Sequence, residues 1–183
     1  MTEPVQTPRL DLVALTPPFY ALCLAGARDA AAEYLGATIA ADWWEEQSIM
    51  AFWLQTLHDD PSVQPWLARA MVRRADQVMI GHIGCHGHPG MAHLEPFAPG
   101  GVELGYRVFP TYRRHGYATE ALHALITWAA VAQRVPGFVL SIVPDNVASQ
   151  AVARRLGFVK VGSHIDEVDG LEEVFALSAP RPL

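Results

Sequence analysis

Residues 101–129 constrain the fold more than any other part of the sequence, because a strand pattern there passes into a helix pattern across one short turn that contains glycine. Residues 101–109 have the two-residue period of a strand. The apolar residues that follow lie on one helical stripe: Ala118, Ala121, Leu122, Leu125, Ile126 and Ala129. A strand that leads directly into an amphipathic helix favours an α/β domain.

Strand and helix patterns also alternate on both sides of this segment. Further strands are predicted at 9–15, 66–73, 78–87, 138–143, 158–165 and 171–177, the last after a turn at Asp169-Gly170. Helices are predicted from Pro17 to about Gly26, then up to Leu35, around 49–57 and from Asn146 to Gly157. Asp42 and Glu45 resemble a capping box for the third of these helices. The short turn before residue 78 predicts that its two flanking strands pair antiparallel.

The composition excludes several classes of protein. The chain has 183 residues, of which 51% are hydrophobic and 17% charged, so it should fold as one domain, 1–183, with a flexible tail at 179–183. A net charge of -6 provides no electrostatic footprint for nucleic acid or an anionic membrane. No segment approaches the roughly 20 apolar residues of a spanning helix, and no signal pattern opens the chain. Cys23 and Cys85 fit small core residues in a reducing compartment, so a cytoplasmic protein is expected.

The turn between strand and helix has the chemistry of an anion site. It reads Arg113-Arg114-His115-Gly116-Tyr117-Ala118-Thr119. The first N–H groups of a helix have no intrahelical partner and lie at the positive end of its dipole, and small residues let a phosphate approach them. Arg113 and Arg114 add charge-assisted donors. An ordinary helix start has the same pattern, so the turn alone does not decide between the two.

This turn resembles the acetyl-coenzyme A signature of the GCN5-related N-acetyltransferase (GNAT) superfamily, Gln/Arg-x-x-Gly-x-Gly/Ala. The resemblance continues, in order and spacing, over residues 101–159: Glu103-Leu104-Gly105-Tyr106-Arg107-Val108-Phe109-Pro110, Val143-Pro144-Asp145-Asn146, Ser149, and Arg155-Leu156-Gly157-Phe158. The opening Thr7-Pro8-Arg9-Leu10 resembles the start of the subfamily that acetylates the N-termini of ribosomal proteins.

The resemblance implies a GNAT fold with acetyl-coenzyme A as co-substrate. That fold has a mixed, mostly antiparallel sheet of about seven strands flanked by helices, and strands four and five splay apart. The main chain near Val108 would meet the pantetheine arm, and Asn146 the pantetheine or its thioester. The diphosphate would rest on the amides of Arg114, Gly116 and Ala118. The remaining cofactor-binding residues implied are Arg113, His115, Tyr117, Thr119 and Arg155.

Two residues are implied to be catalytic. Glu103 stands where many relatives have a glutamate that removes the amine proton, and burial would raise its pKa toward neutrality. Pairing with Arg107, or plain solvation, is the alternative for this carboxylate. Ser149 matches a serine proposed to hydrogen-bond the coenzyme sulfur, although it also fits the third position of a helix N-terminus. Ala153 occupies the position where many relatives have a tyrosine, so no phenolic acid is expected there.

Histidines gather before the strand at 101–109. His82, His86, His88 and His93, with Cys85, offer five potential metal ligands, but their spacing matches no structural zinc pattern and no metal is expected. They fit either an acceptor pocket or the solvated end of a hairpin. The tryptophans before the sheet fit the core, and one or two of them can line an acceptor cleft: Trp43, Trp44, Trp53 and Trp66.

The sequence therefore predicts an N-acetyltransferase that moves acetyl directly from acetyl-coenzyme A to a primary amine on a small molecule or a peptide. The acidic balance favours a cationic acceptor. Neither nucleic acid nor a membrane is expected as a partner, and a homodimer is one assembly that the sequence leaves open. A binding module for coenzyme A or acyl-coenzyme A that has lost catalysis is the alternative. Ala153 favours that alternative, whereas Glu103 argues against it.

Overall fold

The computed structural model of the protein describes residues 4–168 and 170–179, so Asp169 of the predicted last turn and residues 180–183 of the predicted tail lie outside the described residues. The chain divides into two compact units, each made of two stretches of sequence. The first unit comprises Met1–Gly84 and Tyr106–Ala121, and the second comprises Cys85–Gly105 and Leu122–Leu183.

Antiparallel strands form the sheet of the first unit. Their order is β1 (Val5–Gln6), β2 (Leu10–Ala14), β4 (Arg69–Arg73) and β5 (Val78–Cys85), and each pairs antiparallel with its neighbour. The short β3 (Thr38–Ile39) pairs parallel with β5. The predicted antiparallel pairing across the turn before residue 78 is therefore confirmed, although β4 begins at Arg69 rather than at Trp66.

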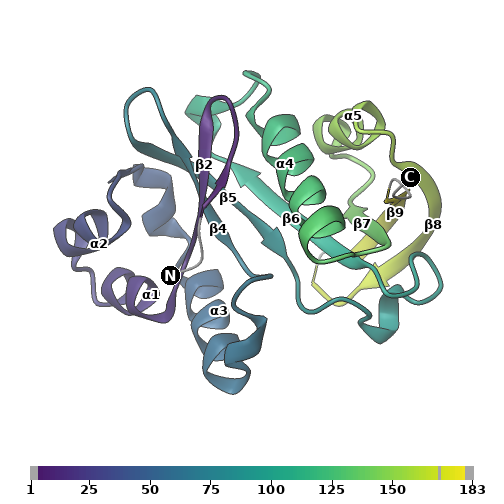
Figure 1. Cartoon of the computed structure of the whole chain (residues 1–183), viewed down its shortest axis with the longest axis horizontal. Helices are drawn as coiled ribbons and strands as arrows, with labels where there is room; N and C mark the ends of the chain where they lie inside the picture. The colour runs from purple at the N-terminus through teal and green to yellow at the C-terminus, as the bar shows by residue number, and fades with distance from the viewer. Residues whose placement is uncertain (1–3, 169, 180–183) are drawn as a thin grey trace. The chain divides into compact units, whose positions relative to one another are not determined.

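Three helices belong to the same unit and lie together beside its strands (Figure 1). They are α1 (Pro17–Leu24), α2 (Arg28–Leu35) and α3 (Gln47–Asp59). Pro17 occupies the first turn of α1, where its missing N–H costs nothing. The predicted capping box is wrong, because Ala41–Glu45 forms a separate 3-10 turn and α3 starts after Glu46.

An aromatic cluster fills the core of the first unit. Trp43 is fully buried, stacks on Trp53 with ring centroids 6.5 Å apart, and donates its indole N–H to Cys23 Sγ. The His82 ring lies edge-on to both indoles at 5.8 and 5.2 Å. Its Nε2 is buried without a hydrogen-bond partner. Burial, with a smaller effect of the Arg107 charge, lowers the pKa of His82 to about 4. His82 is therefore a neutral core residue and not part of a solvated hairpin end.

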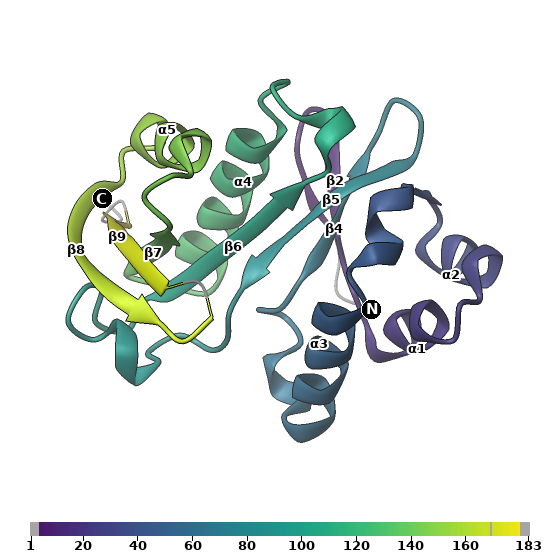
Figure 2. The ribbon, with the colours of Figure 1, turned by 180° about the vertical axis from the view of Figure 1, so that it is seen from behind.

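Four strands form the sheet of the second unit, in the order β6 (Val102–Val108), β7 (Gly137–Ile142), β9 (Gly170–Ser178) and β8 (Val159–Asp166). Figure 2 shows the hairpin of β8 and β9, in yellow, next to β7. The unit also contains α5 (Val147–Arg155). Every residue of β7 except Ser141 is buried, as expected for a strand that is covered on both faces.

Three elements cross between the units along the chain. Strand β5 ends at Cys85, the first residue of the second unit. Strand β6 begins in the second unit and ends in the first, and α4 (Tyr117–Ala132) begins in the first and ends in the second. The apolar stripe predicted for this helix is confirmed, because Ala121, Leu122, Leu125, Ile126 and Ala129 are all buried.

The sheet is mixed and mostly antiparallel, as predicted. The described residues contain nine strands rather than about seven, because the two-residue strands β1 and β3 are too short to leave a sequence pattern. Strands β6 and β7 are parallel, with Val102 opposite Phe138 and Glu103 opposite Val139. Among the described residues no later pair follows, although both strands continue for several residues.

Candidate functional site

The turn before α4 places exposed amides at a helix start. Arg114 and Gly116 have positive φ angles of 65° and 81°. The Arg113 amide donates to Pro110 O at 3.2 Å, but the first amides of α4 have no carbonyl one turn earlier to bond. Arg113, Arg114, His115 and Gly116 are exposed. The geometry therefore offers a positively charged nest of N–H groups to an anion.

Arg9 supports this turn, and sequence reasoning did not include it in the site. Its Nη1 donates to His115 O at 3.0 Å, and its guanidinium lies 4.6 Å from the centre of the Tyr117 ring. Its Nη2 meets Glu120 Oε2 at 2.6 Å. The Thr7 hydroxyl donates to the same carboxyl group at 2.6 Å. The only sequence signal was the Thr-Pro-Arg-Leu opening, which had been interpreted as a subfamily mark and not as a contact of the turn.

Two residues that were expected to bind the cofactor are hydrogen-bonded to each other. Arg113 Nε donates to Val108 O at 2.9 Å, so this guanidinium holds the end of β6. The imidazole of His115 stacks on Tyr117 at 5.8 Å and directs Nδ1 at Arg113 O, 2.7 Å away. Ala118 and Thr119 follow in the first turn of α4 and are partly buried. Seven predicted cofactor residues thus form one continuous turn in the first unit.

The other predicted cofactor residues lie on α5 in the second unit. Asn146 caps this helix, because its side-chain Oδ1 accepts the Ser149 amide at 3.1 Å. Ser149 therefore occupies the third helical position, as the capping interpretation required. Arg155 is exposed in the last turn. Ala153 is fully buried, so its position presents no group to a reacting centre.

Glu103 lies in a cavity of about 520 Å³ within the second unit. The cavity is lined by one face of the four-stranded sheet and by the segment that precedes β6. Its lining residues are His86, His93, Leu94, Phe97, Glu103, Val139, Ser141, His164, Asp166, Glu172 and Val174. Polar groups from β6, β8 and β9 thus share one space with an apolar floor.

Both oxygens of the Glu103 carboxylate have hydrogen-bond partners. Ser141 Oγ donates to Oε1 at 2.5 Å. Oε2 is 3.1 Å from His93 Nε2 and 3.4 Å from His86 Nδ1. The carboxyl side chain is 10% exposed, whereas the two imidazoles are about half exposed. Glu103 pairs with neither Arg107, whose Nε instead meets Glu46 Oε1 at 2.9 Å, nor bulk solvent.

The expected pKa of Glu103 is wrong in direction. Burial does raise it, but the hydrogen bonds and charge of His86, with the bonds from Ser141 and His93, outweigh burial and hold the pKa at about 2. The prediction considered desolvation alone, because the donors come from sequence positions far from Glu103. Glu103 is therefore a permanently ionised acceptor of three hydrogen bonds.

For His86, the effects of its surroundings on the pKa combine to shift it in the opposite direction. Burial lowers its proton affinity, but the hydrogen bond and charge of Glu103, and the charges of Glu172 and Asp166, raise its pKa above the usual value. Its ring packs over Gly105, where a Cβ would lie 2.4 Å from Nε2. Of the predicted histidine cluster, His86 and His93 thus line a cavity, as one of the two interpretations required.

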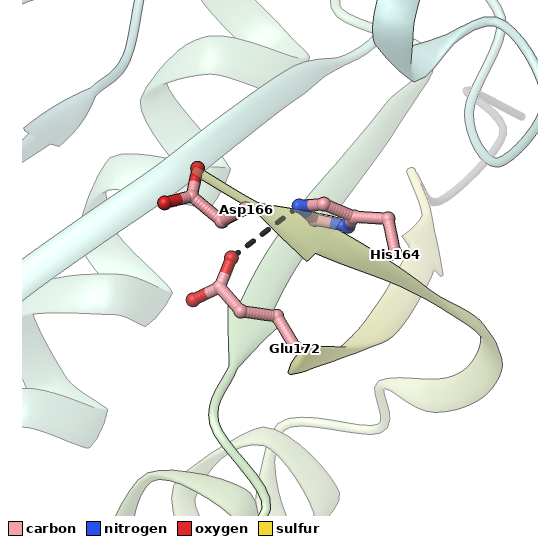
Figure 3. Close-up of side chains that lie close together, drawn as sticks. All are labelled: His164, Asp166 and Glu172. Carbon is pink, nitrogen blue, oxygen red and sulfur yellow. Dashed lines mark ion pairs between the residues drawn. The ribbon is translucent and has the colours of Figure 1, made fainter. Parts of the chain in front are cut away.

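The hairpin of β8 and β9 contributes a set that sequence reasoning missed. His164 is paired directly across the hairpin with Glu172, and Asp166 follows on the same face two residues later. Figure 3 shows the three side chains turned toward one another, with an ion pair of 3.4 Å between His164 Nε2 and Glu172 Oε2. Their ligand atoms lie within 4.8 Å, so this is where the described residues can hold a metal ion. The two-residue spacing of His164 and Asp166 in a predicted strand was the available signal.

The helices of the described part of the chain are either too short or too polar to span a lipid bilayer.

Comparison with known families identifies the domain type. The family model described as an acetyltransferase (GNAT) domain matches residues 9–159. This range includes Arg9, the turn before α4, Glu103 and α5.

The individual relatives share less than a third of their aligned residues with this chain. The uncharacterized N-acetyltransferase YjdG of Bacillus subtilis is 29% identical over 89 residues, which are 49% of this chain and 49% of that protein. The chain thus spans about half the length of the curated relatives it matches. Among solved structures, the ribosomal alpha-N-protein acetyltransferase RimL in complex with coenzyme A is 20% identical with a TM-score of 0.64, covering 96% of this chain and 98% of that one. An acetyltransferase of Agrobacterium tumefaciens is 21% identical with a TM-score of 0.63, covering 97% and 95%.

Proposed function

The chain belongs to the GNAT acetyltransferase family, and we propose that it transfers acetyl from acetyl-coenzyme A directly to a primary amine. The observation that carries the amine acceptor is the cavity around Glu103, in which carboxylates and imidazoles from three strands share one space of about 520 Å³. Carboxylates bind an ammonium group, and an imidazole can accept its proton. Attack on a thioester requires the loss of that proton, because an ammonium nitrogen has no lone pair.

The turn before α4 fits the diphosphate of the co-substrate. Gly116 has a positive φ angle and no Cβ, and the amides of residues 114, 116 and 118 lie at the positive end of a helix of 16 residues. Arg113 and Arg114 add charge, and the Thr119 hydroxyl adds a donor. When bound, acetyl-coenzyme A supplies an activated acyl thioester. Val108, Asn146 and Arg155 complete the proposed binding set.

The acceptor is a cationic amine, on a small molecule or at a peptide N-terminus. Glu103, Asp166 and Glu172 line the cavity, so a positive amine gains Coulomb energy on entering it. Leu94, Phe97, Val139 and Val174 offer an apolar surface to the carbon chain of the acceptor. RimL acts, by its name, on a ribosomal protein, which agrees with a peptide acceptor but does not select it over a small amine.

Ser149 is the proposed hydrogen-bond donor to the departing sulfur. The buried Ala153 leaves no phenol at the alternative position. Loss of a single proton donor typically costs about a hundredfold to ten-thousandfold in rate, so activity survives its replacement by water. We place the reaction in the cytoplasm, since Cys23 and Cys85 are buried and neither forms a disulfide.

The test follows free thiol after mixing the protein with acetyl-coenzyme A and a panel of amines: peptide N-termini, diamines and neutral-chain amines. We expect release that depends on the amine, with cationic acceptors preferred. Gly116→Asp should raise KM for acetyl-coenzyme A at least tenfold, because it places a carboxylate where the diphosphate binds. Gly26→Asp is the matched control, since Gly26 has a φ of 71° and open space around it. Coenzyme A binding without thiol release for any amine would instead establish the non-catalytic module.

A further inference from the structure

We propose that His86, and not Glu103, removes the proton from the acceptor amine, and that Glu103 is a positioning residue that directs the His86 ring. This inference rests on the proposed function and assigns the base within it. It follows from the hydrogen bonds of one carboxylate, the tautomer they impose and the place of one glycine.

Glu103 is unsuited to receive the proton itself. Its Oε1 accepts from Ser141 at 2.5 Å, and its Oε2 accepts from His93 at 3.1 Å and His86 at 3.4 Å. With a pKa of about 2, only about one such carboxyl group in 10⁵ is protonated at pH 7. A group so fully ionised holds a proton too weakly to take one from an ammonium ion.

The same bonds prepare His86 for this role. An ionised carboxylate only accepts hydrogen bonds, so the His86 nitrogen facing it, Nδ1, carries the hydrogen. In the neutral ring Nε2 then has the lone pair. A carboxylate that fixes the tautomer of a histidine and stabilises its protonated form has the orienting role of the aspartate in a Ser-His-Asp triad.

Gly105 allows the His86 ring to place Nε2 against β6. It is the next residue after Glu103 on the same face of the strand, one step beyond the last pair that β6 makes with β7. A Cβ at this position would lie 2.4 Å from His86 Nε2, so the ring rests on the strand only because residue 105 is glycine. Nε2 therefore lies beside Gly105, where the described residues show no pairing between β6 and β7.

His93 contacts the same carboxylate, but through the other ring nitrogen and from a different segment. It comes from the short 3-10 turn Ala92–Leu94 and uses Nε2 for the contact, so its Nδ1 carries the lone pair. The charged or titratable groups that face His86 are Glu103 from β6, His93 from the turn, His164 and Asp166 from β8, and Glu172 from β9. Three of these are carboxylates, which favour the protonated ring that the transfer produces.

The step balances as follows. The ammonium group of the acceptor gives one proton to His86 Nε2, and the neutral nitrogen attacks the thioester carbon. A C–N bond forms and the C–S bond breaks, while the nitrogen loses a second proton that the departing thiolate takes up. The imidazolium then releases its proton to solvent, so the products are an amide, a thiol and one proton.

The first experiment does not depend on activity. Long-range ¹H–¹⁵N NMR of the wild-type protein near pH 8 should show His86 as the Nδ1–H tautomer and His93 as the Nε2–H tautomer. Glu103→Gln should lower the pKa of His86, because it removes the charge that stabilises the imidazolium. An Nε2–H tautomer for His86, or a pKa of His86 that Glu103→Gln leaves unchanged, would overturn the dyad even if the enzyme is active.

The second experiment is the pH profile of kcat/KM. In the wild type it should rise as His86 loses its proton, and Glu103→Gln should move that rise to lower pH while reducing kcat. His86→Gln should lower kcat by about 10²- to 10⁴-fold and abolish the rise. Added imidazole should restore part of the activity of His86→Ala.

Two variants separate the base from its surroundings. Gly105→Ala should displace the His86 ring and lower kcat more than it changes KM, since the neighbour it meets is a movable side chain. His93→Gln removes the other imidazole from the same oxygen and should keep the pH-dependent rise. If His93→Gln abolishes that rise and His86→Gln does not, His86 is not the base. If the wild type releases no thiol with any amine, the proposed function fails, whatever the tautomers are.

Discussion

At the scale of single residues, two histidines of similar sequence setting differ in ionisation. His82 and His86 lie four residues apart and share a strand face by period, yet burial among indole rings lowers the pKa of His82 to about 4, while nearby carboxylates raise that of His86. His93 donates to the same oxygen as His86. The electrostatic environment of each ring, and not its position in the pattern, decides its chemistry.

His82 predicts a pH dependence of stability. Its folded-state pKa of about 4 is below the usual 6.5 of an unfolded chain, so the unfolded state binds the proton first as the pH falls. The free energy of unfolding should therefore decrease between pH 6.5 and 4, by at most about 3 kcal/mol from this group. Urea denaturation of the wild type and His82→Phe at pH 7, 5.5 and 4.5 should show a flatter pH dependence in the variant.

The exposed His58 on α3 provides the control variant for this measurement, because His58→Gln removes an imidazole without altering the buried aromatic cluster. Parallel curves for the wild type and His82→Phe would show that His82 does not titrate differently in the two states.

At the scale of secondary structure, local chemistry explains where α5 begins and what the β8–β9 hairpin presents. Asn146 Oδ1 accepts the Ser149 amide, which satisfies one of the unpaired donors of the helix start. In the hairpin, the register that pairs His164 with Glu172 places both on the cavity face together with Asp166. A shift of one residue would turn this polar set away from the cavity.

The cap of α5 gives a second stability prediction. Asn146→Ala should lower the free energy of unfolding by about 1 kcal/mol, within roughly 0.5–2, because the Ser149 amide loses its acceptor. Asn146→Asp should keep most of the stability, since a carboxylate oxygen accepts the same bond and complements the helix dipole. Chemical denaturation measures both, and equal losses in the two variants would exclude capping as the cause.

At the scale of the whole molecule, the family match describes the sequence, whereas the division into two units describes how the chain packs. The acetyltransferase (GNAT) match over residues 9–159 takes in stretches of both units. A ligand that binds only the folded chain stabilises it by mass action, whatever the internal division.

Coenzyme A should therefore raise the unfolding free energy by about 2.7 kcal/mol at a concentration one hundred times its Kd. Thermal and chemical unfolding with and without ligand measure the effect. Adenosine monophosphate at the same concentration should stabilise less, because it lacks the diphosphate that the turn before α4 would hold. Equal stabilisation by the two ligands would argue against that turn as the binding element.

Much of the architecture was predictable from sequence because it depends on neighbours within a few residues. Pro17 at the start of α1, Asn146 as a cap and the apolar stripe of α4 were all predicted and are all present. The strands β1 and β3 were missed because two residues establish no period, and the capping box at Asp42 failed because a 3-10 turn took those residues instead.

The candidate site also has one part that depends on neighbouring residues in the sequence and another that depends on contacts made by folding. The functional groups of the turn at 113–119 belong to consecutive residues, so its place at a helix start and its positive charge could be predicted from the amino-acid sequence alone. The state of Glu103 could not, because its three donors come from Ser141, His93 and His86, and Arg9 reaches the turn from more than a hundred positions away. Helix caps and turns form between residues that the chain already holds together, whereas a pKa depends on charges and donors within a few ångströms that only folding brings near.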